Sequence, residues 1–220
     1  MENSKQATQE LAAAYAATGN PNGWFEEFYA RAGGDINKIY WADFEPNPLL
    51  IDWVENKYTG HGNRVAIIGC GLGDDAEALA QRGFTVVAFD ISDSAISMCR
   101  KRFPNSQVNY LVADLFTPPV EWLRGFDLVY ECNTVQILAG SQRLDAIHAI
   151  TGLVAPGGSL VVSCRSRKSE PEPNTFPIPL DHDEINKFAQ GDLTEIYFLS
   201  YDDDQEPPVP HYFAVYRRPD

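Results

Sequence analysis

The residues VAIIGCGLGDD, at positions 65–75, decide the fold. Val65 to Ile68 is a short apolar run bounded by glycine, which favours a strand buried on both faces. Three glycines follow at alternate positions: Gly69, Gly71 and Gly73. Glycine lets the backbone turn sharply and approach a ligand closely. Because the pattern from Asp74 to Gln81 is helical, the stretch predicts a strand, a glycine-rich turn and a helix.

Strands and helices alternate beyond this stretch. The expected strands cover residues 84–89, 108–112, 126–130 and 159–164, and the expected helices cover 92–102 and 142–154. Apolar strands that alternate with helices form a parallel sheet covered on both sides. After residue 181 the pattern predicts a helix and two strands, at about 193–200 and 210–217, which form an antiparallel hairpin. The sequence therefore predicts a three-layer, doubly wound α/β fold.

The N-terminal region is predicted to be helical, without strands. Residues 4–18 and 21–32 are predicted to be helical, and a third helix is expected over 46–56. We expect residues 1–60 to form a helical lid or cap. Residues 61–220 would form the ligand-binding domain, and the two parts would be one structural unit.

Composition excludes several partners. The 220 residues carry a net charge of −14, which repels nucleic acid and anionic membranes. No stretch approaches the roughly 20 apolar residues of a membrane span, and the polar N-terminus has no signal-peptide pattern. We therefore expect a cytoplasmic protein. The four cysteines and four histidines are scattered without metal-ligand spacing, so no metal site is predicted.

Acidic residues follow three successive strands and indicate the ligand. Asp90 ends the second strand, where a carboxylate can bind ribose hydroxyls. Asp114 follows the third strand, where it could receive an adenine amino group. A dinucleotide would put its pyrophosphate at the helix start, where Asp74 and Asp75 oppose an anion. The loop also lacks a glycine three residues after Gly71. S-adenosylmethionine (SAM), which has no phosphate and carries positive charges, fits this pattern better.

The sequence resembles the class I SAM-dependent methyltransferases over about residues 60–165. The matching motifs are residues 65–73, 86–92, 109–116, 126–133 and 153–162. The resemblance implies a mostly parallel seven-stranded sheet whose last strand is reversed and inserted beside the fifth. It also implies SAM as cofactor, S-adenosylhomocysteine as product, and a set of cofactor-binding residues: Gly69, Cys70, Gly71, Gly73, Asp74, Asp90, Ile91, Asp114, Leu115 and Glu131.

A weaker resemblance concerns the methyl acceptor. Residues 41–50, WADFEPNPLL, resemble the Trp-Asp…Pro-Leu segment of the thiopurine, thiol and halide methyltransferases, although Phe44-Glu45 replaces their usual Gly-Arg. In that group N-terminal helices cover cofactor and substrate. The expected substrate or lid residues are Trp24, Phe28, Tyr40, Trp41 and Arg165. The aromatic residues could also simply pack the cap, and Arg165 and Arg167 could bind an acidic substrate or be surface charges.

These observations predict SAM-dependent methyl transfer, by in-line displacement, to a small-molecule nucleophile such as a thiol, another heteroatom or a hydroxyl. Glu131 is the candidate general base if the acceptor needs one, although cofactor contact is an alternative role. Residues 131–136 lack the Asn/Asp-Pro-Pro-aromatic motif of nucleic-acid methyltransferases. Two alternatives remain open: a non-catalytic SAM-binding protein and an NAD(P)-dependent oxidoreductase. The acceptor and the oligomeric state are left open.

Overall fold

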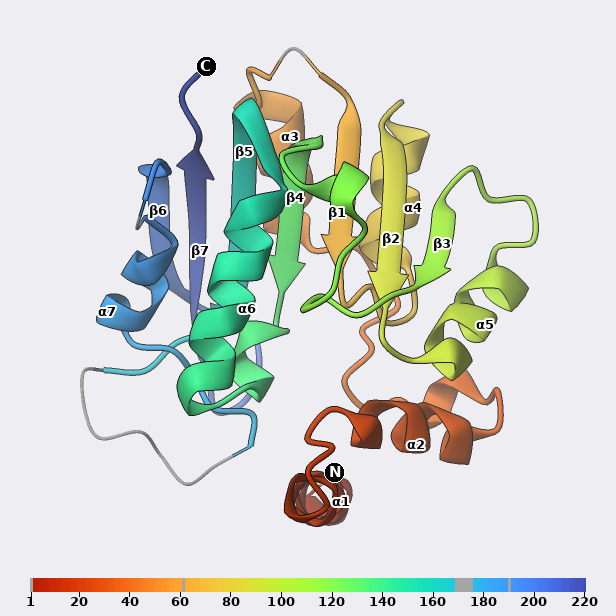
Figure 1. The fold of residues 1–220 in the computed structure, drawn as a ribbon. Helices are drawn as coiled ribbons and strands as arrows, with labels where there is room; N and C mark the ends of the chain where they lie inside the picture. Colours follow the sequence, from red (N-terminus) through yellow and green to blue (C-terminus); the bar gives the residue numbers. More distant parts are fainter. Residues whose placement is uncertain (1, 61, 169–175, 190) are drawn as a thin grey trace.

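The computed structural model describes residues 2–60, 62–168, 176–189 and 191–220. Within these residues, seven strands form one sheet in the order β3-β2-β1-β4-β5-β7-β6 (Figure 1). The parallel strands are β1 (Arg64–Ile68), β2 (Thr85–Asp90), β3 (Asn109–Val112), β4 (Phe126–Cys132) and β5 (Val154–Arg165). β7 (Pro210–Arg217) runs antiparallel between β5 and β6 (Thr194–Asp202). The expected doubly wound sheet and its terminal hairpin are confirmed.

Helices cover both faces of this sheet. α6 (Gly140–Leu153) and α7 (His182–Ile185) pack on one face, together with short 3-10 turns at Val120–Trp122 and Asn186–Ala189. α3 (Pro48–Asn56), α4 (Asp74–Gln81) and α5 (Asp93–Arg102) pack on the other. β1 shows why both layers are needed, because its residues from Val65 to Ile68 are all buried and point alternately into the two cores.

Several element boundaries differ from the sequence-based expectation by one or more residues, and two of these differences have a clear local cause. The third helix begins at Pro48, not residue 46, because the Asn47 side chain caps it by accepting the N–H groups of Leu49 and Leu50. The fifth strand begins at Val154, not Ser159, because Val154 already pairs with Phe126 across an irregularity in the β4–β5 register. Proline and glycine at 156–158 therefore mark a bulge within the strand.

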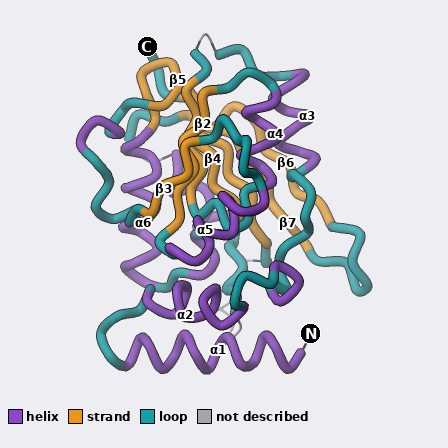
Figure 2. The backbone as a smooth tube through the Cα atoms, turned by 90° about the vertical axis from the view of Figure 1, so that its right-hand side faces the viewer, coloured by secondary structure: helices purple, strands orange, loops and turns teal. Residues whose placement is uncertain are grey.

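Two N-terminal helices lie across one edge of the sheet. α1 (Glu2–Ala17) and α2 (Gly23–Ala32) lie below the arrowheads of β1, β2 and β4 in Figure 1, and Figure 2 shows them stacked beneath the sheet. A 3-10 turn at Ile36–Lys38 follows α2. Helices α1 and α2 therefore face the carboxyl ends of the parallel strands, where α/β proteins bind ligands.

In the described part of the chain, no helix combines the length and apolar character that a membrane crossing requires.

The terminal hairpin is expected to contribute to global stability. Phe213 on β7 is buried, whereas Ile196 on β6 is exposed. Phe213→Ala should lower the free energy of unfolding by about 3–5 kcal/mol, because it leaves a cavity in the core. Ile196→Ala should change it by less than about 0.5 kcal/mol. Urea denaturation measures both, and equal losses would show that the hairpin is not part of the cooperative core.

Candidate functional site

The loop between β1 and α4 requires its glycines. Gly69, Gly71 and Gly73 have φ angles of 57°, 53° and 89°, in the left-handed region that favours glycine. A Cβ at Gly69 would lie 2.6 Å from the Thr134 hydroxyl, and one at Gly73 would collide with the hydroxyl of buried Tyr110. The loop therefore lies too close to the neighbouring strands to carry side chains at these positions.

The carboxylate of Asp90 closes this loop onto the end of β2. One oxygen accepts the Gly71 N–H at 3.1 Å and the other accepts the Ser92 N–H at 2.9 Å. Burial raises the pKa of Asp90 to about 6, although the hydrogen bonds from Ser92 and Gly71 oppose that shift. The Asp90 carboxylate therefore links the glycine loop to the start of α5.

The end of β3 lies beside Asp90. The Ala113 N–H donates to the Asp90 carbonyl at 3.0 Å, and the Asp114 carboxylate accepts the Phe116 N–H at 2.9 Å. Ile91 is 36% exposed, whereas Leu115 is buried. The structure thus brings together, at one edge, the acids and apolar residues that the sequence assigns to a nucleoside.

Glu131 lies at the end of β4 and has no exposed surface. Its Oε1 accepts the N–H groups of Thr134 and Val135 at 2.6 and 2.9 Å, which orients the 3-10 turn Val135–Ile137. Among the described residues, Oε2 has no hydrogen-bond partner. Burial raises the pKa of Glu131 to about 7, although the two backbone N–H groups oppose the shift.

The two acids at the start of α4 have different partners. Asp74 forms two bonds with the Arg102 guanidinium, each 2.8 Å long. Asp75 accepts the Asn47 N–H at 2.7 Å, and burial raises its pKa to about 6. The sequence analysis assigned Asp74 to cofactor binding. In the structure its carboxylate pairs with the Arg102 guanidinium, and a local sequence pattern cannot predict this ion pair.

Helix α2 is attached directly to the start of α5. The Glu26 carboxylate accepts hydrogen bonds from the Ser92 hydroxyl at 2.8 Å and from the Ser94 N–H and hydroxyl at 3.0 and 2.7 Å. Burial raises the pKa of Glu26, but these hydrogen bonds outweigh it and leave the pKa below its ordinary value. Sequence reasoning missed Glu26 because nothing local distinguishes it from any acid in a first helical turn.

A second lid residue that the sequence analysis missed is Tyr29. It is buried, and its hydroxyl lies 3.3 Å from the position that a Cβ on Gly71 would take. The Trp41 indole N–H points to the same hydroxyl at 3.4 Å. Tyr29 thus covers the glycine loop, and its position next to Phe28 in an aromatic helix gave no separate signal.

The predicted lid residues form two groups. Phe28 stacks on Trp41 with ring centroids 4.1 Å apart, and Tyr40 meets both rings edge-on. Burial raises the pKa of Tyr40, while a hydrogen bond with Thr8 and the positive charge of Arg165 oppose this. Arg165 is the last residue of β5. Trp24 is buried at the start of α2 and contacts the Phe176 ring edge-on, with ring centroids 5.4 Å apart.

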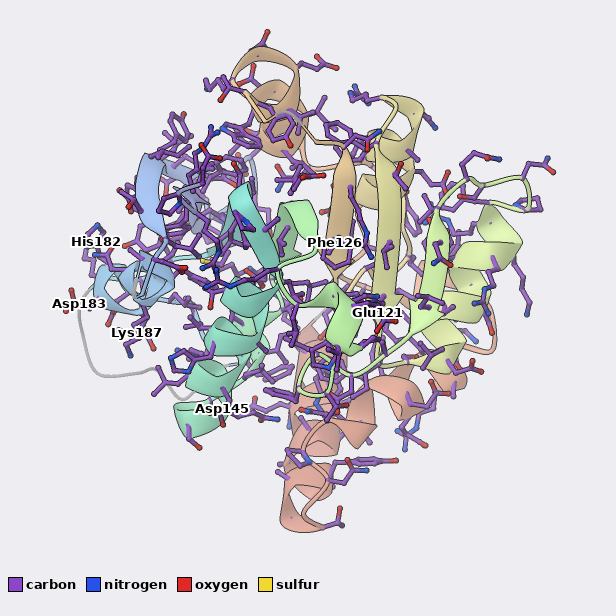
Figure 3. The ribbon with its side chains drawn as sticks, turned by 45° about the horizontal axis from the view of Figure 1, so that its top comes forward. Glu121, Phe126, Asp145, His182, Asp183 and Lys187 are labelled. Carbon is purple, nitrogen blue, oxygen red and sulfur yellow. The ribbon has the colours of Figure 1, made fainter. Side chains whose placement is uncertain are left out.

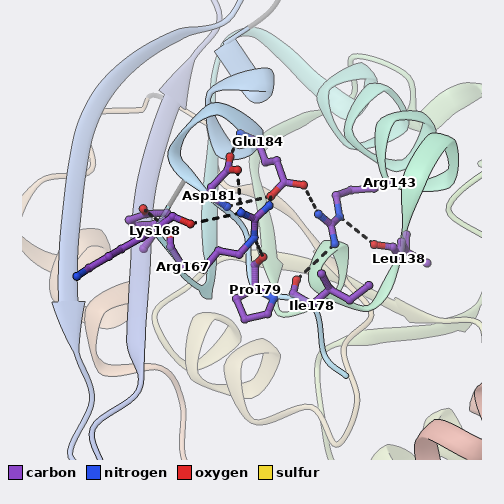
Figure 4. A network of polar contacts seen from close by, with 9 residues as sticks. Leu138, Arg143, Arg167, Lys168, Ile178, Pro179, Asp181 and Glu184 are labelled. Carbon is purple, nitrogen blue, oxygen red and sulfur yellow. Dashed lines mark hydrogen bonds and ion pairs between the residues drawn. The ribbon is translucent and has the colours of Figure 1, made fainter. Parts of the chain in front are cut away.

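Arg167 does not share the position of Arg165. It pairs with Asp181 at 3.0 Å and with Glu184 at 2.8 Å, and its Nε donates to the Pro179 carbonyl (Figure 4). The Arg167 guanidinium is thus held by two carboxylates of the protein, and its role toward an acidic substrate or as a surface charge stays a prediction. Figure 3 places three neighbouring polar residues on the outer side of the same region, at α7 and beyond: His182, Asp183 and Lys187.

Comparisons with known proteins agree with this geometry. Residues 65–158 match the family model of a methyltransferase domain. The chain is 28% identical over 142 residues to a ubiquinone biosynthesis O-methyltransferase of Azoarcus sp. (strain BH72), covering 60% of each chain. It is 30% identical over 132 residues to the enzyme of the same name from Azotobacter vinelandii (strain DJ / ATCC BAA-1303), covering 57% of this chain and 56% of the relative. The matches thus span under two thirds of these curated relatives.

A solved structure shares the fold over nearly the whole chain. The N-methyltransferase NodS from Bradyrhizobium japonicum WM9, in complex with S-adenosylhomocysteine, aligns with a TM-score of 0.63 at 19% identity, covering 99% of this chain and 100% of that one. The chain has the fold of this methyltransferase. Over residues 65–158, the match to a methyltransferase domain confirms the main resemblance. The weaker resemblance to the thiopurine, thiol and halide methyltransferases stays a prediction.

Two glycines with the same backbone conformation allow a matched test of the loop. Gly73 and Gly83 have φ angles of 89° and 87°, but only at Gly73 would a Cβ meet another side chain. Gly83→Ala should cost about 1 kcal/mol of unfolding free energy through strain alone. Gly73→Ala should cost at least about 1 kcal/mol more, because Tyr110 must also move. Similar losses in urea denaturation would contradict the close packing of the loop.

The buried carboxyl of Glu131 predicts a pH dependence of stability. Because its pKa in the folded protein is about 7, above the ordinary 4.5, the folded state binds this proton more tightly than the unfolded state. The stabilisation that protonated Glu131 gives the folded state is therefore complete below about pH 4.5 and is lost as the pH rises through about 7. Glu131→Gln should reduce the fall in unfolding free energy between pH 5 and pH 8 by about 1–3 kcal/mol. Parallel wild-type and variant profiles would refute the assignment.

Proposed function

We propose that the chain binds SAM at the carboxyl edge of β1 to β4 and transfers its methyl group to a small-molecule nucleophile. One observation carries the proposal: Asp90 and a tightly packed three-glycine loop meet at this edge, under a helix that covers them. The match of residues 65–158 to a methyltransferase domain and the fold of the NodS complex support the same function.

The residues at this edge fit each part of the cofactor. The glycine loop would approach the methionine portion, and Asp90 has lone pairs left for ribose hydroxyls after accepting its two backbone N–H groups. The exposed side chain of Ile91 would pack on the adenine, beside Asp114 and Leu115. Asp74 is not part of this proposed set, because Arg102 holds its carboxylate.

A dinucleotide fits the same edge less well. Helix α4 has three acids in its first turn: Asp74, Asp75 and Glu77. A pyrophosphate at this helix start would meet like charge, which costs binding free energy where a dinucleotide site gains it. The alternative of an NAD(P)-dependent oxidoreductase is therefore disfavoured on electrostatic grounds.

When bound, SAM supplies a methyl group on a sulfonium, which is already activated for displacement. The chain would contribute alignment and the exclusion of water. Tyr29 and Trp41 cover the glycine loop, so α2 and the segment after it would shield the reacting groups. Glu131 would orient residues 134 and 135 instead of removing a proton, because it is sealed from solvent and its Oε1 is already engaged.

The acceptor would be a small organic molecule held between the lid and the ends of β4 and β5. The stacked pair of Phe28 and Trp41 offers apolar surface there, and Arg165 at the end of β5 offers the one positive group of the predicted substrate set. The net charge of −14 disfavours nucleic acid. The curated relatives are named as O-methyltransferases, which supports a hydroxyl among the candidate nucleophiles.

Isothermal titration with S-adenosylhomocysteine, with NADH as the control ligand, tests the cofactor. We expect the wild-type protein to bind S-adenosylhomocysteine with micromolar affinity and not to bind NADH. Asp90→Asn should weaken this binding at least about tenfold, because it removes the charge that ribose hydroxyls and the loop N–H of Gly71 both use.

Absence of heat in a well-folded sample would refute the cofactor assignment. If the protein binds S-adenosylhomocysteine, incubation with methyl-labelled SAM and a panel of small thiols, phenols and amines tests turnover. Tight binding without transfer to any acceptor would instead support the alternative of a non-catalytic SAM-binding protein.

A further inference from the structure

Arg165 differs from the other arginines of the chain in the surroundings of its guanidinium. Every other arginine forms at least one side-chain hydrogen bond or ion pair. Within the described residues, the guanidinium of Arg165 forms neither. Its backbone is nevertheless fixed, because its N–H donates to the Gln136 side chain at 2.8 Å and its carbonyl accepts the Leu180 N–H at 3.0 Å. The main chain thus holds a cationic residue in place without pairing its charge.

The side chain of Arg165 lies on the α3 face of the sheet. Successive side chains of a strand point to opposite faces, so Arg165 shares a face with Ser163. The Ser163 hydroxyl accepts a hydrogen bond from Asn47 Nδ2 at 3.2 Å, and Asn47 caps α3. Arg165 is two residues closer to the carboxyl edge, at the last position of β5. It is therefore placed at the edge where the proposed acceptor would lie.

A histidine lies directly opposite Arg165 on the neighbouring strand. Arg165 pairs with His211 in the antiparallel β5–β7 register, so their side chains share a face with Cβ atoms about 4.5–5.5 Å apart. His211 Nδ1–H donates to the Val209 carbonyl at 2.8 Å, and the ring stacks on Tyr201 of β6 with centroids 5.4 Å apart. The imidazole is thus held on two sides, and among the described residues its Nε2 makes no hydrogen bond.

The acid nearest to this histidine is engaged by its own loop. Asp203 Oδ2 lies 3.8 Å from His211 Nδ1, while its Oδ1 accepts the N–H groups of Gln205 and Val209 at 3.1 and 2.9 Å. Burial raises the pKa of Asp203, but these hydrogen bonds outweigh it and leave the pKa below its ordinary value. Asp203 therefore lies on the Nδ1 side of the ring, and in the described part of the chain no carboxylate pairs with Arg165.

We propose that Arg165 binds a carboxylate of the methyl acceptor, with His211 Nε2 as a second contact, so that the acceptor is a small organic acid. This inference rests on the proposed methyl transfer and names its substrate class. A guanidinium can donate two parallel N–H bonds to one carboxylate, and a doubly protonated imidazole donates from both nitrogens. The stacked rings of Phe28 and Trp41 would contact the apolar part of the same molecule.

The net charge of the chain makes these two residues decisive for an acidic acceptor. A chain with a net charge of −14 repels small anions over most of its surface. A carboxylate can therefore gain binding free energy only where positive groups are locally in excess. Because the other arginines are already engaged, Arg165 meets this condition without breaking an existing contact.

The first experiment titrates benzoate, and its neutral isostere benzamide, into the protein saturated with S-adenosylhomocysteine. The wild-type complex should bind benzoate at least about tenfold more tightly than benzamide, because only benzoate offers a carboxylate to the guanidinium. Isothermal titration measures both affinities and, in the preceding step, the binding of S-adenosylhomocysteine itself.

Three variants assign the preference to residues. Arg165→Gln should abolish the preference for benzoate. Arg217→Gln removes the same charge at the opposite end of the β5–β7 pair, where Arg217 is in register with Ser159, and should keep the preference. His211→Asn should bind benzoate more weakly than wild type but keep part of the preference, because Arg165 is still present.

A second measurement uses the wild-type protein and does not depend on how a variant folds. Phenylglyoxal modifies arginine side chains, and peptide mass mapping shows which ones have reacted. Arg165 should react faster than Arg167, whose guanidinium is held by Asp181 and Glu184. Benzoate should slow the modification of Arg165, and benzamide should not.

Equal binding of benzoate and benzamide, with normal binding of S-adenosylhomocysteine, overturns this inference and leaves the proposed function intact. A preference that survives Arg165→Gln, or a modification of Arg165 that benzoate does not slow, also overturns it. Failure of the wild-type protein to bind S-adenosylhomocysteine refutes the proposed function and this inference together. Thermal unfolding checks the variant: Arg165→Gln should unfold within about 2 °C of wild type, because its guanidinium has no partner to lose.

Discussion

The arrangement of the site depends on the hydrogen bonds of one buried carboxylate. Asp90 accepts the N–H of Gly71 from the loop after β1 and the N–H of Ser92 at the start of α5. Because Glu26 binds Ser92 and Ser94, the lid helix is fixed to that same point. Hydrogen bonds of Asp90 and Glu26 therefore connect the glycine loop, the end of β2, the start of α5 and helix α2.

The lid is attached on both sides of the sheet. On the α6 side, Gln142 donates to the Asn22 side chain at 2.9 Å and Phe176 packs against Trp24. On the α5 side, Glu26 provides the attachment. Helix α2 must then cross the carboxyl edge between these points, as Figure 1 shows. The burial of Tyr29 above Gly71 follows from this crossing.

Local chemistry predicted the parts of this structure that depend on consecutive residues. The helix from Asp74 to Gln81, the Ser92 cap and the position of Asp90 follow from apolar runs, glycines and capping residues. The pairing of Asp74 with Arg102 joins residues 28 positions apart. Such contacts depend on how helices are placed around the sheet, which no local pattern records, and this is why Glu26 and Tyr29 escaped prediction.

The residues that local sequence patterns predicted and the residues that they missed lie in different parts of the chain. The residues with sequence signatures lie within 65–158, the part that matches a methyltransferase domain. The residues that cover the site come from α2 and the segment around Trp41, outside that range. A sheet edge that binds one cofactor can keep its glycines and acids while its lid varies with the acceptor. We therefore propose that acceptor specificity in this chain depends on the contacts around Phe28, Trp41 and Arg165.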